Sequence, residues 1–231
     1  MKTFIDTDPF FPGNPEAECF ARLLPEEMEL IRESKTQILF HRGESLTKQG
    51  AFGSSILFIV SGLAKQYVEE GTQRNFNLRL IGHGEFTGLS VVFHKNVYDY
   101  SVVALKETLV CLIEKEAVAS LIRQNGQFAF GLIKRYSEQN SLLFDTIRHM
   151  VYKQMNGRLA DTLLYLGSVT FRHENVFAFL SRKDVADFAG LSTESTVKLL
   201  KSFEKDGMIS LEEKDIVIRD ADALKLISKR G

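Results

Sequence analysis

The sequence predicts an α+β protein in which an antiparallel β-roll is followed by one long helix and then by a compact C-terminal part of short helices and a hairpin. Three observations predict this class. Half of the 16 glycines fall between residues 35 and 115, where they separate short runs of β-branched and aromatic residues. Beyond Lys115 the apolar residues recur at helical spacing, and no proline follows Pro25. The composition, 44% hydrophobic and 26% charged, is that of a globular chain and excludes a disordered or fibrous one.

The same composition excludes several classes of function. No apolar run approaches the roughly 18 residues that a membrane-spanning helix needs, and Met1–Asp8 lacks the apolar core of a signal peptide. Two cysteines, Cys19 and Cys111, are too few for a disulfide framework. We therefore expect a cytoplasmic protein without a membrane partner. The net charge of −1 gives no overall basic excess that would by itself indicate a nucleic acid.

Residues 1–125 are expected to form the β-roll, an effector or sensor domain, together with short N-terminal helices. Proline suits the first position of a helix, so Pro15 and Pro25 are each expected to begin one. Glu69–Thr72 has the composition of a hairpin turn. Short strands at close and regular spacing are typical of an antiparallel roll or barrel. The expected strands are Ile38–Phe40, Ile56–Val60, Ala64–Val68, Phe76–Ile81 and Val102–Ile113.

A long helix is expected from about residue 126 to residue 154, within the segment 126–155 that we assign to dimerisation. Its seam residues recur at alternating intervals of three and four, which is the a/d rhythm of a coiled coil and indicates a homodimer. Leu142, Phe144 and Val151 form a second apolar edge, which we expect to contact the roll of the same chain. In the alternative, the whole stripe packs on its own domain. The predicted interface residues are Ile133, Tyr136, Asn140, Leu143, Ile147 and Met150.

Residues 156–231 form the third predicted domain, and Asn156–Gly157 is the expected break after the long helix. A helix over Arg158–Tyr165 and a strand over Val176–Phe179 are expected to precede two more helices, a hairpin and a last short helix. The pattern therefore predicts a small, densely packed domain.

Within this domain, Leu180–Ser210 has the pattern of two short helices joined by a tight turn. Ser181 followed by Asp184 is typical of a capped helix start, and Gly190 can adopt the left-handed conformation that ends a helix. Ser192 can cap the second helix. A short helix, a glycine turn and a capped second helix constitute a helix-turn-helix. The strands of the following hairpin, Ile209–Leu211 and Ile216–Ile218, would form the wing of a winged helix.

The start of the second helix has the small and polar residues that let a helix enter the major groove of double-stranded DNA. Glu194 can accept from a cytosine amino group and Lys198 can reach a guanine or a phosphate, as Thr196 can reach a phosphate. In the alternative, Glu194 and Lys198 form an ordinary exposed ion pair. Residues 156–231 carry 12 basic and 12 acidic residues, so two copies about 34 Å apart, reading a near-palindromic operator, are expected. The candidate DNA-binding residues are Ser192, Thr193, Glu194, Ser195, Val197, Lys198, Lys201, Arg182 and Lys183.

Taken together, these features resemble the CRP/FNR family of bacterial transcription regulators. The resemblance is carried by Phe40–Glu44 with Gly50, by Leu57–Gly62, by Gly84–Phe86 with Gly88, by Gly157–Ala160 and by the helix-turn-helix. It implies a sensor like a cyclic nucleotide-binding domain, a long dimerisation helix and a C-terminal winged helix-turn-helix. It further implies an unknown small-molecule effector, allosteric control of DNA binding and recruitment of RNA polymerase. We therefore expect a regulator and not an enzyme.

The resemblance also locates a candidate effector pocket. Family members that bind cyclic nucleotides carry Gly-Glu-Leu and then Arg-Ser, whose arginine pairs with the phosphate; here Gly88-Leu89-Ser90 and Tyr100-Ser101 stand at these places. A buried cyclic phosphate without a cationic partner is unfavourable, so no response to cyclic AMP is expected. The oxygen-sensing branch holds an iron–sulfur cluster with four cysteines, and this chain has two. In the recognition helix, Lys198 replaces the family's arginine, which binds a guanine bidentately.

Three alternatives stay open at this point. A sensor of gas or redox state would hold haem through one of five scattered histidines. A cupin-like metalloenzyme would use roll residues as ligands, although the clustered His-x-His pattern is missing. In the third alternative the winged helix binds a protein. The haem candidates are His41, His83, His94, His149 and His173, and the metal candidates are His41, Glu44, His83, Glu85 and His94.

Overall fold

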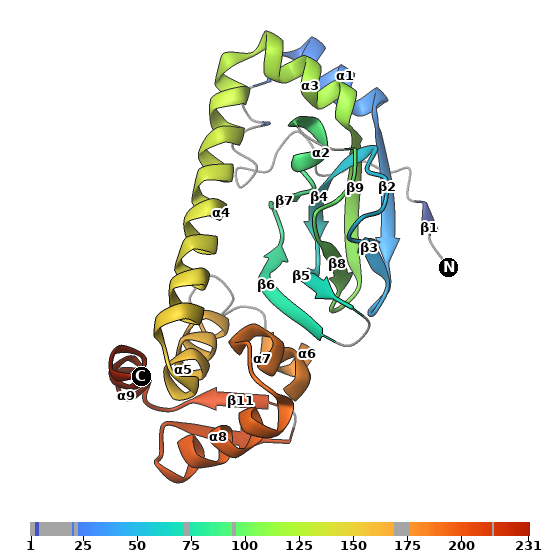
Figure 1. Ribbon diagram of the computed structural model, residues 1–231. Helices are drawn as coiled ribbons and strands as arrows, with labels where there is room; N and C mark the ends of the chain where they lie inside the picture. Colours follow the sequence, from blue (N-terminus) through green and yellow to red (C-terminus); the bar gives the residue numbers. More distant parts are fainter. Residues whose placement is uncertain are drawn as a thin grey trace. The chain divides into compact units, whose positions relative to one another are not determined.

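The computed structural model describes residues 3–4, 20, 23–71, 74–93, 96–168, 176–213 and 215–231, and the chain divides into two compact units. The first unit comprises residues 1–74 and 79–141, and the second comprises residues 75–78 and 142–231. Helix α4 (Gly126–Tyr152) contributes to both units (Figure 1). Two expected features, the helix starting at Pro15 and the end of the hairpin turn at Thr72, lie outside the described residues.

The predicted β-roll is confirmed, and it consists of two antiparallel sheets (Figure 1). The five-stranded sheet has the order β1-β2-β9-β4-β7, and the four-stranded sheet has the order β3-β8-β5-β6. The strands are β1 (Thr3–Phe4), β2 (Lys35–Phe40), β3 (Ser45–Thr47), β4 (Ser55–Ser61), β5 (Leu63–Glu70), β6 (Arg74–Gly82), β7 (Phe86–Thr87), β8 (Ser101–Ala104) and β9 (Thr108–Glu114).

The single strand expected over Val102–Ile113 is wrong, because the chain changes sheets within it. Strand β8 pairs with β5 in the four-stranded sheet, whereas β9 pairs with β2 and β4 in the five-stranded sheet. The buried hydroxyl of Thr108 stabilises the crossing, since it accepts from the Leu63 amide and donates to the Leu63 carbonyl. Lys106 and Glu107, two charged residues between Leu105 and Thr108, mark this corner in the sequence, and the expected strand runs across them.

The core of the roll lies between the sheets and extends to the helices that cover them. Helix α1 (Pro25–Glu33) begins at Pro25 as expected and contributes the fully buried Ile31. Helix α3 (Lys115–Gln124) contributes Leu121, and α4 contributes Phe128 and Leu132. Burying a large apolar side chain of this kind contributes about 1.5–3 kcal/mol. The first two turns of α4 are therefore anchored to the roll. A four-residue helix, α2 (Ser90–Phe93), follows β7.

Beyond these two turns, α4 exposes its apolar side chains. Leu142, Phe144 and Val151 are 50%, 60% and 66% exposed. They belong to the second unit, so their expected contact with the roll stays a prediction. The alternative, in which the whole stripe packs on its own domain, is wrong for Ile133 and Tyr136, which are 63% and 56% exposed within the first unit. Along the described helix, only Phe128 and Leu132 are buried. A 27-residue helix is about 40 Å long, and both of these buried residues lie in its first two turns.

The second unit is a small domain of five helices and one hairpin among the described residues. The break after α4 falls at Lys153–Gln154, three residues earlier than expected. Gly157 lies inside the next helix, where an added Cβ would meet the backbone of Gly231 at 3.1 Å. Its role is therefore the close packing of two helices and not the interruption of one. The elements are α5 (Met155–Leu166), α6 (Val176–Phe179), α7 (Arg182–Ala189), α8 (Thr193–Lys205), β10 (Ile209–Glu212), β11 (Asp215–Ile218) and α9 (Ala221–Arg230).

The strand expected over Val176–Phe179 is wrong, because this segment is helix α6. A short apolar run bounded by polar residues fits a buried strand and a buried helical turn equally well. Val176 and Phe177 are buried, and the Leu180 amide donates to the Phe177 carbonyl. The helical turn packs on β11 and satisfies its backbone groups locally.

Candidate DNA-binding surface and effector site

The helix-turn-helix has the local geometry that its sequence predicts. Ser181 Oγ accepts from the Asp184 amide at 3.1 Å, and Asp184 Oδ2 accepts from the Ser181 amide at 2.8 Å, which completes a capping box on α7. Gly190 ends that helix in the left-handed conformation, with φ of 62°. Ser192 Oγ accepts from the Ser195 amide and caps α8. The caps fix where both helices begin and hence the angle of the turn.

One face of α8 anchors it to the domain. Thr196, Leu200 and Phe203 are buried at spacings of four and three, which is one side of a helix. The expectation that Thr196 contacts a phosphate is therefore wrong: its side chain is fully buried, and its hydroxyl has no hydrogen-bond partner among the described residues. Val197, another candidate, is half-buried at the edge of this face.

The opposite face of α8 is open. Ser192, Thr193 and Lys201 are exposed, and Ser195 is half-buried. Glu194 and Lys198 are 79% and 74% exposed and form the ion pair of the alternative interpretation, at 2.7 Å. Exposed pairs of this kind contribute about 0.3–0.5 kcal/mol. Separating the pair to contact DNA therefore costs little.

The wing lies beside the helix-turn-helix and is tied to it by two contacts. Strands β10 and β11 pair antiparallel from Ile209↔Ile218 to Glu212↔Asp215. Arg182 donates to the carbonyls of Glu213 and Asp215 at the wing turn, and Glu204 Oε1 accepts from the Leu211 amide. Burial lowers the pKa of Arg182, and the carboxylates of Asp215 and Glu204 oppose this shift.

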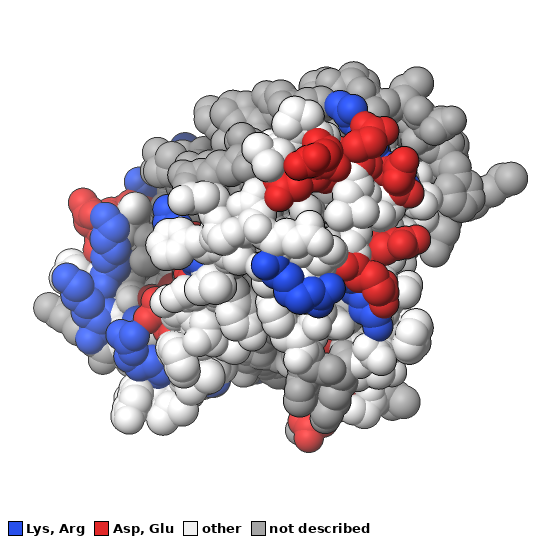
Figure 2. Space-filling model, turned by 90° about the horizontal axis from the view of Figure 1, so that it is seen from above, with Lys and Arg blue, Asp and Glu red and all other residues white. Residues whose placement is uncertain are grey.

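The two basic candidates on α7 have different surroundings. Arg182 is half-buried and holds the wing, which the sequence did not indicate, because the wing turn lies about 30 residues further along the chain. Lys183 is exposed and pairs with Asp187 at 2.9 Å. Figure 2 views the molecule from above, at the end that carries α1 and α3 in Figure 1, and shows acidic and basic side chains there, some of them next to one another.

The predicted seam of α4 is largely open to solvent. Ile133, Tyr136, Leu143 and Ile147 are each more than 40% exposed, and Asn140 is exposed among them. Met150 is half-buried, and its sulfur accepts from Arg158 Nη1 at 3.7 Å. An unpaired helix rarely exposes so many large apolar side chains in one stripe.

Of the candidate effector residues, the structure brings Tyr100 and Gly88 into hydrogen-bond contact. The Tyr100 hydroxyl accepts the Gly88 amide at 2.8 Å and the Thr87 hydroxyl at 3.1 Å. Gly88 has φ of +84°, and a Cβ there would lie 3.1 Å from the Tyr98 ring, so glycine is required both by conformation and by space. Leu89 is buried beside it, and Ser90 Oγ, at the start of α2, is buried without a hydrogen-bond partner among the described residues.

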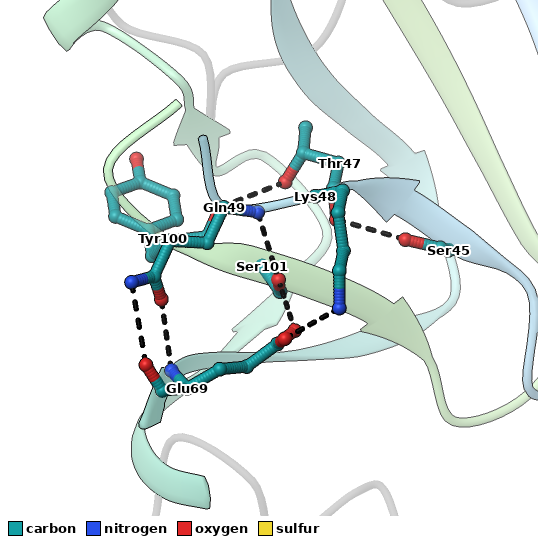
Figure 3. A network of polar contacts seen from close by, with 7 residues as sticks. All are labelled: Ser45, Thr47, Lys48, Gln49, Glu69, Tyr100 and Ser101. Carbon is teal, nitrogen blue, oxygen red and sulfur yellow. Dashed lines mark hydrogen bonds and ion pairs between the residues drawn. The ribbon is translucent and has the colours of Figure 1, made fainter. Parts of the chain in front are cut away.

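Ser101 belongs to a polar network on the neighbouring strands (Figure 3). Its Oγ donates to Glu69 Oε1 at 2.6 Å and accepts a hydrogen bond from the backbone N–H of Gln49 at 2.9 Å. Gln49 in turn pairs with the backbone of Glu69, and Lys48 Nζ binds Glu69 Oε2. Hydrogen bonds from Lys48 and Ser101 lower the pKa of Glu69, so this carboxylate is ionised. The hydrogen bond with Glu69 raises the pKa of Lys48.

The sequence interpretation missed Glu69 and Gln49 as parts of this site. Glu69 was expected only in a turn, and Gln49 lies in a loop. Their approach to Ser101 depends on the pairing of Tyr67 with Ser101 between β5 and β8. The register between two strands that are distant in sequence cannot be predicted from a local pattern. The one indication in the sequence is an acidic residue, Glu69, near the end of an expected strand.

The histidine and metal alternatives receive no support from the described residues. His41 faces Glu107, His83 Nδ1 lies against the Val60 carbonyl, and Glu85 pairs with Arg79. In the part of the chain that the structure describes, no group of three or more His, Cys, Asp or Glu side chains could hold a metal ion. Cys111 is fully buried on β9. His94, His173 and Cys19 lie outside the described residues.

Known protein families match both parts of the chain. Residues 37–125 match the model of the cyclic nucleotide-binding domain, and residues 157–227 match the Crp-like helix-turn-helix domain. A CRP-like cAMP-activated global transcriptional regulator of Mycobacterium tuberculosis is 22% identical over 217 residues, which cover 90% of this chain and 95% of that protein. No described helix combines the length and apolarity needed to cross a membrane.

Solved structures share the fold. A putative transcriptional regulator of the crp/fnr family from Eubacterium rectale has a TM-score of 0.78 at 17% identity, covering 94% of this chain and all of that one. The c-di-GMP responsive global regulator CLP of Xanthomonas campestris has a TM-score of 0.74 at 17% identity, covering 84% of this chain and 98% of that one. The relatives are regulators rather than enzymes, as expected. A cyclic nucleotide-binding domain followed by a Crp-like helix-turn-helix, in this order and on this fold, places the chain in the CRP/FNR family of transcription regulators.

Proposed function

We propose that the protein is a dimeric, sequence-specific DNA-binding regulator whose helix α8 reads the major groove. The observation that carries this proposal is the capped start of α8, with Thr193, Glu194 and Lys198 exposed while Leu200 and Phe203 anchor the opposite face. Small and polar side chains at this end leave room for base edges, and the free N-terminal amides of a helix attract phosphate.

The basic side chains divide into two roles in this proposal. Lys183, Lys198 and Lys201 are exposed and contact phosphates or, for Lys198, a guanine. Arg182 already donates to two wing carbonyls, so it acts by holding the wing in place and offers its remaining donors to the backbone of the duplex. Because positive charge is this limited, binding needs two copies of the domain.

The proposed dimer forms through the exposed stripe of α4. Ile133, Tyr136 and Ile147 would each leave water in a paired helix, and Asn140 would fix the register. Each buried side chain of this size contributes about 1.5–3 kcal/mol, so a handful suffices for stable association. Two copies present two α8 helices to successive major grooves. The two half-sites of a near-palindromic operator correspond to this two-fold arrangement.

The remaining parts of the proposal rest on the family. We propose a cytoplasmic regulator that acts with RNA polymerase at promoters, through a sensor whose effector is not cyclic AMP. Relatives named for cyclic AMP and for c-di-GMP share this fold, so ligand chemistry differs among similar sensors. In this chain the Tyr100 hydroxyl accepts from the Gly88 amide.

Selection from a random pool of double-stranded oligonucleotides tests this function. We expect the purified protein to enrich a near-palindromic sequence at low ionic strength. Glu194→Ala should relax the preference at one base position in each half-site by about 1–3 kcal/mol while changing non-specific binding little. Glu116→Ala, an exposed carboxylate on α3, is the matched control and should select the parental sequence. Equal losses on all sequences in the Glu194 variant would contradict base reading.

A further inference from the structure

The loop between β7 and α2 contains a buried backbone amide, that of Gly88. Gly88 has a left-handed conformation that turns its N–H towards β8, and the Gly88 residue itself is buried. An amide N–H in such a place needs an acceptor. The acceptor is the Tyr100 hydroxyl, at 2.8 Å, and the same oxygen also accepts from the Thr87 hydroxyl. The phenol oxygen of Tyr100 therefore accepts two hydrogen bonds, one from the Gly88 amide and one from the Thr87 hydroxyl.

The second polar group of the site is equally committed. The Ser101 hydroxyl donates to Glu69 Oε1 at 2.6 Å and accepts from the Gln49 amide at 2.9 Å (Figure 3). Ser101 is fully buried and the Glu69 side chain is 19% exposed, so these bonds are shielded from water. A ligand that used Ser101 would have to displace a carboxylate from it.

The charge next to Ser101 opposes an anionic ligand. The Glu69 carboxylate is ionised, and its cationic partner, Lys48, reaches it from the outer side with a side chain that is 60% exposed. A phosphate on Ser101 would lie within hydrogen-bond distance of this carboxylate, and like charges so close are strongly unfavourable. The Gly88 amide, the Thr87 hydroxyl and the Ser101 hydroxyl thus all have partners within the chain, and the carboxylate of Glu69, which is paired with Lys48, is the charged group next to Ser101.

We propose that Tyr100 is a built-in occupant of the effector site. Its hydroxyl takes the place of a ligand oxygen on Gly88 and Thr87, fastens the β7–α2 loop to β8, and leaves DNA binding independent of any nucleotide. Glu69 completes this arrangement by excluding anionic ligands from Ser101. Tyr100 is therefore a positioning residue that determines specificity. This proposal rests on the proposed DNA-binding function only in its statement that DNA binding does not depend on a nucleotide.

The test compares Tyr100→Phe with Tyr98→Phe in the full-length protein. Tyr98 is a matched control, since it is also buried and its hydroxyl donates to the Ser55 carbonyl and not to the loop. Each sample is unfolded, dialysed and refolded, so that no small molecule is carried over. Two readouts are taken: hydrogen exchange of the Gly88 amide, and affinity for the selected operator with and without cyclic AMP or cyclic GMP at about 1 mM.

We expect the refolded parental protein to bind the operator without nucleotide, and neither nucleotide to change its affinity. Tyr100→Phe should exchange the Gly88 amide about tenfold faster and bind the operator about tenfold more weakly, as expected for the loss of one buried acceptor. Tyr98→Phe should leave both readouts close to the parental values.

Two results would overturn the proposal. One is a parental protein that binds DNA only after cyclic AMP or cyclic GMP is added. The other is a Tyr100→Phe variant whose Gly88 amide stays as protected, and whose operator affinity stays as high, as in the control. If no sample bound any DNA while Tyr100→Phe still released the Gly88 amide, the DNA-binding function would be wrong, and the role of Tyr100 in the loop would stand.

Discussion

Single residues in this protein have roles that depend on what faces them across the fold. Tyr100, Ser101 and Glu69 are ordinary residues in the sequence, and they become a site because β5 and β8 pair in one register. The capping serines are the opposite case. Ser181 and Ser192 act on amides three residues away, so their roles could be predicted from the sequence and are confirmed.

Glu69 gives a prediction about pH. Since hydrogen bonds from Lys48 and Ser101 lower its pKa in the folded state, Glu69 stabilises the roll above its ordinary pKa of about 4.3, and this contribution is lost as the pH falls through the lower folded value. Glu69→Gln should therefore be less stable than the parental protein by about 1 kcal/mol near neutrality, and equally stable in acid.

Urea unfolding at a series of pH values measures this difference. Glu70→Gln, the next residue and exposed, is the control and should show no pH-dependent difference from the parental protein. A constant deficit of the Glu69 variant at every pH would contradict an ionic role.

At the scale of elements, local patterns predict well and partner-dependent surfaces do not. The two helices of the helix-turn-helix and the wing follow from caps, glycines and alternation, which act within a few residues. The strand expected over Val176–Phe179 failed because four apolar residues suit two conformations. Leu142, Phe144 and Val151 are exposed, and their expected contact with the roll stays a prediction, because they belong to the other unit. The pattern of an apolar stripe does not predict which surface packs against it.

The seam of α4 supplies a prediction about assembly. Ile147→Glu places a charge in the exposed stripe, and burying an unpaired carboxylate between two helices is strongly unfavourable. We expect monomers in sedimentation equilibrium and a large loss of operator affinity. Leu142→Glu is the matched control: Leu142 is 50% exposed on the same helix, and five residues of helix turn it about 140° away from Ile147.

The control should remain dimeric and bind the operator like the parental chain. An intact dimer for Ile147→Glu would show that the stripe does not form the interface.

For the whole molecule, the balance of charge limits how DNA can be bound. With a net charge of −1, the chain lacks the broad positive field that holds many DNA-binding proteins on any sequence. In the proposed complex, the exposed Lys183, Lys198 and Lys201 would supply about three phosphate contacts in each copy. The family and the fold could be predicted from the order of motifs along the sequence, but the effector site could not, since it depends on contacts between β5, β7 and β8.

The dependence of affinity on salt tests this picture. A dimer with about six phosphate contacts should show a slope of roughly −5 in log affinity against log salt concentration. Lys201→Ala removes one contact from each copy and should reduce the slope by about 2. Arg32→Ala, on α1 of the roll, is the control and should leave the slope unchanged. A reduction by only about 1 would mean that a single copy contacts the duplex.

The bond between Tyr100 and Gly88 has an evolutionary consequence. Its donor belongs to the main chain of Gly88, so no substitution at another position of the loop removes that N–H. The acceptor is the tip of one side chain. Under the proposal, a substitution at position 100 alone would therefore change whether DNA binding by this sensor requires an effector. The sequence of the loop at residue 88 would not have to change.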